Sequence, residues 1–301
     1  MTGPKPVLDD MTVVIPTLGR ETLAECLQRI AAGVAWPAKL ILVDQGENRR
    51  VAEWKAEHTA RGLNVDHVTA PRRGRAAAVN RGLERVETRF VAVTDDDCFV
   101  APDWLRRMTE HLRREPGGIV TGRVEPAGDE RVVAVVTSRV PATYRRPRLK
   151  HDSLSGGNMG AAIVVLAKIG PLDEDPCLAT AEDCEYSYRA LRTGVPITYA
   201  PDVVVAHLGW RDTGQRAETY QAYARSRAGF YGKYLRRGDW FIALRVGVQL
   251  VRALKRWGLG AIARDRDSVL NGRANVIGLV PGLVAGWRSG RTRAGEGPLS
   301  A

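Results

Sequence analysis

Three consecutive carboxylates, Asp95, Asp96 and Asp97, lie one residue beyond the short apolar run FVAV at residues 90–93. The run predicts a buried strand, and ionised carboxylates crowded at its end repel one another unless a cation lies among them. A hard divalent cation such as Mg²⁺ or Mn²⁺ takes oxygen ligands and often binds carboxylates together with substrate phosphates. Since α/β sheets bind ligands at the carboxyl ends of their strands, the stretch predicts a metal and phosphate site. The alternative is a solvated acidic turn whose last carboxylate caps a helix beginning near Pro102.

Apolar strands and amphipathic helices alternate around this stretch. The segment at residues 21–32, for example, spaces Leu23, Leu27 and Ile30 on one helical face and is followed by Gly33. Four strand–helix pairs in succession predict a parallel sheet with helices on its faces and right-handed connections. The expected strands lie at residues 11–17, 40–43, 63–68 and 89–93, and the expected helices at 21–32, 49–60, 74–85 and 102–114.

The pattern is looser in the second half of the chain. Thr180 is a suitable N-cap for a helix with Asp183 three residues on, and Gly194 would end that helix. The later expected elements are a strand at 119–124, a strand or helix at 132–140, a basic loop at 144–150, a Gly-rich turn at 155–160, a helix at 180–193, one or two strands at 197–207, and helices from 213 onward.

Composition and charge bound the class of protein. The 301 residues are 44% hydrophobic and 26% charged, which is typical of a globular protein. The net charge of +11 is uneven: residues 1–206 hold 28 Lys or Arg and 28 Asp or Glu, whereas residues 207–301 hold 17 and 6. A neutral front and a basic tail predict a catalytic or binding domain followed by an attachment segment.

Targeting signals and cysteines point to the cytoplasm. The first residues, MTGPKPVLDDM, contain no apolar stretch typical of a secretory signal, and no apolar run is long enough to span a bilayer. The four cysteines form no C-x-x-C pair, which argues against a zinc ribbon or a redox motif. We therefore expect reduced thiols in a cytoplasmic protein.

Five motifs follow one another along the front of the chain: VVIPT, VDQG, RGRAAAVNRG, TDDDC and AEDCEY. Their order and spacing resemble the nucleotide-sugar-binding GT-A domain of glycosyltransferase family 2, over about residues 11–210. The resemblance implies an α/β fold of GT-A type, Rossmann-like, with a mostly parallel sheet and helices on both faces. It also implies a catalytic domain at residues 1–212, followed by a C-terminal helical and basic region at 213–301.

The resemblance assigns several residues to the donor nucleotide. Pro16 and Thr17 would pass beneath the base, and Asp44 would accept the imide N–H of uracil or thymine, which favours UDP or dTDP sugars. Arg75 would face nucleotide phosphate or base. The alternatives are a turn-stabilising role for Asp44 and a solvated charge at a helix start for Arg75.

The three carboxylates match the D-x-D signature of the family. Asp95 would take the ribose hydroxyls, Asp97 would bind the Mg²⁺ or Mn²⁺ that bridges the two phosphates, and Asp96 would support donor binding or cap a helix. His207 stands where many relatives complete the metal site from the C-terminal side. The alternative for a lone histidine is a structural or exposed position.

The resemblance also implies the chemistry of the acceptor. Asp183, in the pair Glu182-Asp183, would act as the general base that deprotonates the acceptor hydroxyl, and one base implies direct displacement with inversion. The alternative is that Asp183 belongs only to the first turn of a helix capped by Thr180. Glycines at 156 and 157 would let the backbone approach the sugar, and Asn158 could hydrogen-bond it, unless this segment is a turn without ligand contact.

The basic tail contains an amphipathic pattern. Residues 239–257 are apolar apart from one polar stripe of helical spacing, a pattern typical of helices that lie on a membrane surface. A second apolar segment, at 275–287, is interrupted by Pro281. A helical subdomain packed on the sheet or on another subunit is the alternative; no nucleic-acid-binding signature is present, so no nucleic-acid partner is expected. The stripe consists of Arg245, Gln249, Arg252 and Arg256.

These expectations combine into one functional hypothesis. The protein would be a metal-dependent inverting glycosyltransferase of hexosyltransferase type, peripheral on the inner face of the cell membrane. It would move a sugar from a nucleoside-diphosphate sugar to a glycan or lipid-linked acceptor of the cell surface. One alternative, a sugar-nucleotidyltransferase, needs a Gly-rich loop after the first strand, and residues 16–20 contain a single glycine. The other, a non-catalytic nucleotide-sugar-binding protein, is disfavoured because Asp97 and Asp183 are retained.

Overall fold

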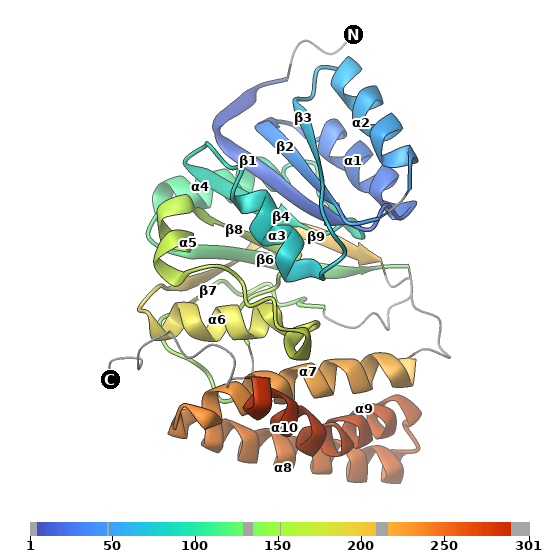
Figure 1. The fold of residues 1–301 in the computed structure, drawn as a ribbon, viewed down its shortest axis with the longest axis vertical. Helices are drawn as coiled ribbons and strands as arrows, with labels where there is room; N and C mark the ends of the chain where they lie inside the picture. The colour runs from blue at the N-terminus through green and yellow to red at the C-terminus, as the bar shows by residue number, and fades with distance from the viewer. Residues whose placement is uncertain (1–4, 47, 129–134, 151, 209–215, 290–301) are drawn as a thin grey trace. The chain divides into compact units, whose positions relative to one another are not determined.

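The computed structural model is an α/β protein with a central sheet and a set of C-terminal helices (Figure 1). It describes residues 5–46, 48–128, 135–150, 152–208 and 216–289. The chain divides into two compact units. The first unit comprises residues 1–147, 153–172 and 186–209, and the second comprises 148–152, 173–185 and 210–301.

The described strands of the first unit form one mixed sheet. Its strand order is β3-β2-β1-β4-β8-β6-β9-β5, with β7 paired to β9. The pairs β3–β2, β2–β1 and β1–β4 are parallel, as the strand–helix alternation predicts, whereas β8 pairs antiparallel with β4 and with β6. The strands are β1 (Val7–Thr17), β2 (Trp36–Asp44), β3 (Val65–Thr69), β4 (Phe90–Thr94), β5 (Cys98–Val100), β6 (Ile119–Ala127), β7 (Ala142–Tyr144), β8 (Asn158–Ala162) and β9 (Ile197–Leu208).

Helices follow the parallel strands at nearly the predicted places. The helices cover both faces of the sheet, so consecutive residues of the central strands, such as Val13 and Val14 of β1, are inaccessible to solvent. This explains why these strands are continuous apolar runs without alternation. Gly82 allows α3 to approach β1 closely, because a Cβ at this position would lie 2.4 Å from Cγ1 of Val14. The helices are α1 (Thr22–Ala32), α2 (Arg50–Ala60), α3 (Arg75–Leu83), α4 (Trp104–Arg114), α5 (Ile163–Ile169) and α6 (Glu182–Arg192).

The segment at 155–160 differs from its prediction as a turn. Its second half is the buried strand β8, which fills the sheet between β4 and β6. Glycine suits this strand because a Cβ on Gly160 would lie 2.7 Å from Sδ of Met108 on the covering helix α4. The Gly- and Asn-rich composition that indicates a turn is here a consequence of close packing.

Three further predictions concern residues 132–140, residues 197–207 and the domain boundary. Residues 197–208 form one strand, β9, whose register against β6 shifts between Gly122 and Arg123. The predicted element at 132–140 falls partly outside the described residues, and within the described part Val136 forms an isolated bridge with Val124. The predicted domain boundary at 212/213 also lies outside the described residues.

The second unit is mostly helical. Its helices α7 and α10 pack very closely, because a Cβ on Gly286 would lie 1.9 Å from the carbonyl oxygen of Gly229. The predicted interruption of the apolar segment at 275–287 is observed as the break between α9 and α10 at Gly278. Pro281, the third residue of α10, has no N–H to donate to the carbonyl of Ile277 and so cannot continue α9. The helices are the short 3₁₀ turn η1 (Pro176–Leu178), α7 (Arg216–Arg236), α8 (Trp240–Ala263), α9 (Arg266–Ile277) and α10 (Leu279–Ser289).

Candidate active site

The three carboxylates occupy the short turn between β4 and β5. Asp96 and Asp97 are buried, with 3% and 7% of their surface exposed. The residue at the N-cap of α4 is Asp103, and its side chain makes no capping hydrogen bond. The alternative of a solvated acidic turn that caps the following helix is therefore wrong.

Asp96 is held by the end of β1. The Thr17 hydroxyl donates to Oδ2 of Asp96 at 2.7 Å, and an Arg20 N–H donates to Oδ1 at 3.2 Å. Burial raises the pKa of Asp96 to about 6; the Thr17 and Arg20 contacts oppose this rise, while the charge of Asp97 adds to it. The Thr17 oxygen also accepts the Gly19 N–H at 2.9 Å. The Thr17 hydroxyl therefore connects the loop after β1 to the turn that contains Asp96.

Asp95 pairs with Arg75, the first residue of α3. The Nε–H of Arg75 donates to Oδ1 of Asp95 at 2.7 Å, so Arg75 is not simply a solvated charge at a helix start. Gly157 makes room for this pair, since a Cβ there would lie 2.8 Å from Oδ2 of Asp95. The glycine was predicted to let the backbone approach a sugar, and the structure shows that it admits the Asp95 carboxylate.

Asp97 and His207 come together through the antiparallel pairing of β5 with β9. Cys98 is in register with His207, and Nε2 of His207 lies 3.7 Å from Oδ1 of Asp97. The possible ligand atoms of Asp97, Cys98 and His207 lie within 4.8 Å of one another. Sequence reasoning identified Asp97 and His207 but not Cys98, whose neighbourhood depends on strand register.

The chemistry of these groups fits a divalent cation. A carboxylate and an imidazole are acceptable ligands for Mn²⁺ or Mg²⁺, with further oxygens from phosphate or water. Nδ1 of His207 is buried and has no hydrogen-bond partner among the described residues. Burial, reinforced by the nearby carboxylates, raises the pKa of the Cys98 thiol well above its ordinary value. Sulfur is also a soft ligand, which suits Mg²⁺ or Mn²⁺ less than oxygen does.

Asp44 lies at the end of β2, in register with Thr17 at the end of β1. Its Oδ1 accepts the Gly46 N–H at 2.8 Å, and Oδ2 lies 3.1 Å from Nε2 of His67. Asp44 therefore stabilises a turn, yet a carboxylate has lone pairs beyond these two contacts. Pro16, one residue before Thr17, is buried within β1. His67 was not anticipated, because only the β2–β3 pairing brings it to Asp44.

Asn158 has a structural position. It is fully buried, its Oδ1 accepts from Nε1 of Trp104 at 2.9 Å, and its Nδ2 donates to the carbonyls of Arg123 at 3.1 Å and Val203 at 3.0 Å. Both amide hydrogens are thus used within the sheet region. Asn158 stabilises the pairing of β6, β8 and β9, which corrects its assignment to the donor sugar.

Asp183 belongs to the second unit, in the first turn of α6. Its Oδ1 accepts the backbone N–H of Cys184 at 2.7 Å. The hydroxyl of Thr180 is buried without a hydrogen-bond partner among the described residues, so the predicted capping by Thr180 is not observed. Arg227 of α7 interacts electrostatically with Asp183, so a cation lies near this carboxylate, which the sequence predicts as a base.

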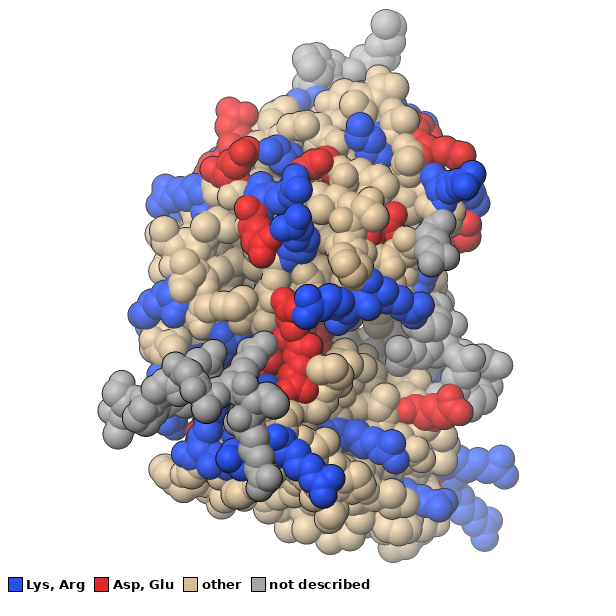
Figure 2. Space-filling view, in the orientation of Figure 1, with Lys and Arg blue, Asp and Glu red and all other residues tan. Residues whose placement is uncertain are grey.

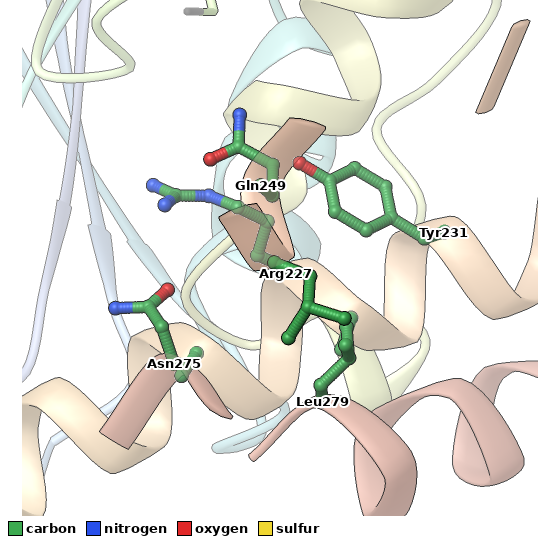
Figure 3. A pocket seen from close by; sticks show the side chains of 8 residues that line it. Arg227, Tyr231, Gln249, Asn275 and Leu279 are labelled. Atoms are coloured by element: carbon green, nitrogen blue, oxygen red, sulfur yellow. The ribbon is translucent and has the colours of Figure 1, made fainter. Parts of the chain in front are cut away.

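Arg227 also lines a small pocket inside the second unit, with Tyr231, Gln249, Asn275 and Leu279 (Figure 3). Its cavity volume of about 20 Å³ suits an ordered water. The Arg227 Nε and the Tyr231 hydroxyl have no hydrogen-bond partner among the described residues. Burial raises the pKa of Tyr231 to about 12 although Arg245 and Arg227 oppose it, so the hydroxyl keeps its proton. Nothing in the sequence separates Arg227 from the surface charges of the basic tail.

The family model and the curated relatives that match this chain are all glycosyltransferases. The model of the family described as Glycosyl transferase family 2 matches residues 12–164, slightly more than half of the 301 residues. A pre-mycofactocin glycosyltransferase of Mycobacterium tuberculosis is 26% identical over 207 residues, which are 66% of this chain and 42% of that protein. Glycosyltransferase AglE of Haloferax volcanii is 23% identical over 210 residues, 65% of this chain and 66% of its own length. The chain thus spans less than half of the first of these relatives.

Solved structures share the fold. Mannosyltransferase PcManGT from Pyrobaculum calidifontis, in complex with GDP-Man and Mn²⁺, has a TM-score of 0.62 at 18% identity, covering 93% of this chain and 88% of that one. TarS of S. aureus has a TM-score of 0.56 at 15% identity, covering 87% and 54%. At these identities the likeness shows a common fold, that of the GT-A glycosyltransferases.

Proposed function

The chain belongs to glycosyl transferase family 2, and from this premise we propose that it transfers a sugar from a nucleoside-diphosphate sugar to an acceptor hydroxyl, with inversion and with the help of a divalent cation. The observation that carries the proposal is the approach of His207 to Asp97 beside two further carboxylates. PcManGT and GalNAc-T7, two proteins with the same fold, were solved with Mn²⁺. This supports a role for a divalent cation, which we place at Asp97 and His207.

The donor nucleotide would lie across the ends of β1, β2 and β4. Asp44 would accept an N–H from the base with the lone pairs not used by Gly46 and His67, and this favours UDP or dTDP. TarS was solved with UDP and with UDP-GlcNAc, whereas PcManGT was solved with GDP-Man. A carboxylate also suits the N–H groups of guanine, so a donor test has to include GDP sugars.

Some residues around the proposed metal site would bind the cation, and others hold the carboxylates in position. Asp97 and His207 would hold Mg²⁺ or Mn²⁺, which when bound offsets negative charge on the departing nucleoside diphosphate. Thr17 and Arg20 hold Asp96 in place and so fix the turn that presents Asp97. Arg75 fixes Asp95, which would accept hydrogen bonds from the ribose hydroxyls.

Asp183 would take the proton of the acceptor hydroxyl as its oxygen attacks the anomeric carbon. One base on the acceptor side, with the nucleoside diphosphate leaving from the opposite face, gives inversion in a single displacement. We extend the proposal to a glycan or a lipid-linked acceptor of the cell surface, because the basic C-terminal helices are suited to an acceptor that is itself anchored at a surface.

A panel of UDP, dTDP and GDP sugars, incubated with the purified protein and Mn²⁺ or EDTA, tests this function. Slow release of one nucleoside diphosphate that requires the metal and is lost in Asp97→Asn supports it. Turnover unaffected by EDTA, or metal-dependent donor binding without turnover on any acceptor, would contradict a metal-dependent transferase. Release of pyrophosphate from a nucleoside triphosphate and a sugar phosphate would point instead to a nucleotidyltransferase.

A further inference from the structure

The first part of the polar stripe of α8 faces the interior of the second unit. Arg245 is 2% exposed and donates to the carboxylate of Asp152, whereas the amide of Gln249 donates to the carbonyls of Leu149 at 3.3 Å and Lys150 at 3.2 Å. Burial raises the pKa of Asp152, yet the charges of Arg245 and Arg227 hold it below its usual range, so the buried pair is ionised. The stripe expected to edge a membrane-facing surface is therefore largely an internal one.

The opposite face of α8 is apolar and exposed. Most of its side chains are three, four or seven residues apart, and Leu259 lies at the edge of the same side, on a helix that is about 36 Å long at 1.5 Å per residue. Exposure reaches 72% at Trp240 and 82% at Ile262. We call this surface the apolar face of α8, and its members are Trp240, Leu244, Val251, Leu254, Leu259 and Ile262.

This arrangement is the reverse of that of an ordinary surface helix, which buries its apolar side and exposes its polar side. Scattered exposed apolar residues are common, but a contiguous stripe along a whole helix marks an interaction surface. Figure 2 shows a broad uncharged surface along the lower edge of the view, where α8 lies, with Lys and Arg at its margins. Transfer of these apolar side chains out of water would lower the free energy, so contact with an apolar partner is favoured.

The charge around the face decides among the possible occupants. Lys255 is exposed on the same side of α8 as the apolar face, and residues 216–289 contain 14 Lys or Arg against 4 Asp or Glu. A second copy of this surface would bring like charges together, whereas an anionic surface would complement them. Trp240, at the first turn of α8, is a residue type suited to the boundary between headgroups and acyl chains.

We propose that the apolar face of α8 lies in the headgroup region of an anionic lipid bilayer, with Lys255 beside the lipid phosphates. The helix would lie parallel to the membrane plane rather than cross it. Among the described residues no single helix combines the length and apolar character needed to cross a bilayer, whereas α9 and α10, bent by 41° at their junction, meet these criteria together. The proposal concerns binding alone and does not rest on the proposed transferase activity.

Flotation of the full chain with vesicles tests the proposal. Wild type is expected to float with phosphatidylcholine–phosphatidylglycerol vesicles and much less with pure phosphatidylcholine. The double variant V251Q/L254Q removes two exposed apolar side chains and should lower the partition coefficient by about tenfold or more. Ile262→Gln, at the far end of the helix, should lower it as well. Val164→Gln is the matched control, because Val164 is more exposed, at 76%, than Val251 or Leu254 and lies on α5 of the first unit.

Charge is tested separately. Lys255→Gln should weaken binding to the mixed vesicles and not to pure phosphatidylcholine, with Lys168→Gln as the control for an exposed lysine elsewhere. Wild type that stays unbound to both vesicles would overturn the proposal, as would V251Q/L254Q floating like wild type. A dimer in solution that V251Q/L254Q dissociates, without vesicle binding, would show that a second copy covers the face and would also overturn it.

Discussion

Nε2 of His207 lies 3.7 Å from Oδ1 of Asp97, although the two residues belong to strands far apart in the chain. The antiparallel pairing of β5 with β9 produces this approach, since Cys98 and His207 are directly opposite each other. A carboxylate and an imidazole so placed, one residue from the buried Asp96, form the part of the site with the clearest metal-binding chemistry.

His207→Gln should weaken Mn²⁺ binding. Loss of an outer partner of a metal ligand alone costs roughly 10–100-fold in affinity, so loss of a ligand should cost at least about tenfold. Electron paramagnetic resonance of free Mn²⁺ during a titration measures the affinity. His111→Gln is the control, because His111 contacts Asp202 on the surface. Equal affinities in the two variants would remove His207 from the metal site.

Thr17→Val should destabilise the fold through Asp96. The variant keeps the size of the side chain but removes the hydroxyl that donates to the buried carboxylate at 2.7 Å. A buried acceptor that loses its donor costs about 1–3 kcal/mol. Urea unfolding should show this loss, and Thr17→Ser should recover most of it. The account of Asp96 is wrong if the valine and serine variants are equally stable.

The second unit should lose stability in acid through Asp175. Burial raises the pKa of Asp175, but hydrogen bonds from Ser289 and Cys177 and the charge of Lys233 lower it to about 2. A carboxyl with a lowered folded pKa stabilises the fold above its ordinary pKa of 3.8, and this contribution disappears as the pH falls toward 2.

Asp175→Asn should therefore be less stable than wild type at pH 5, with the difference shrinking as the pH falls through about 4 toward 2. Denaturant midpoints at several pH values measure this difference. Glu218→Gln, an exposed carboxylate on α7, should show no such convergence. A gap between wild type and Asp175→Asn that stays constant with pH would exclude the ionised Asp175 carboxylate as its cause.

Gly286→Ala should force α7 and α10 apart. The added Cβ would lie 1.9 Å from the carbonyl oxygen of Gly229, and overpacking of this kind costs about 1–3 kcal/mol or more. Gly247→Ala is the matched control: a Cβ at that exposed position of α8 meets nothing within 4 Å. It should stabilise the helix by about 0.5–1 kcal/mol. Thermal unfolding of the two variants should shift in opposite directions.

The sequence predicts the parallel half of the sheet well because its signals are local. Strands such as β4 are continuous apolar runs, and helices such as α1 carry one apolar face and a terminal glycine. The strand β8 was missed because Gly and Asn indicate turns, whereas here they fit a strand packed tightly on both sides. The mixed half of the sheet thus depends on tertiary contacts.

The same distinction holds at the site. Asp95, Asp96 and Asp97 are visible as a local cluster, but their partners Thr17 and Arg75 follow from strand register and helix placement. Asn158 looked available for a ligand because its burial cannot be seen in a Gly-rich segment. On α8 the polar residues formed a recognisable stripe, yet the sequence could not show that Arg245 of this stripe faces Asp152 and not solvent.

The most direct test of the central claim measures UDP binding by calorimetry with Mn²⁺ and with EDTA, in wild type and in Asp97→Asn. UDP is the probe because TarS, a protein of the same fold, was solved with it; GDP and dTDP are measured in parallel. We predict binding of one nucleoside diphosphate that is strong with Mn²⁺, weakens by about tenfold or more with EDTA, and becomes insensitive to Mn²⁺ in Asp97→Asn. Binding with the same Mn²⁺ dependence in Asp97→Asn would contradict the account.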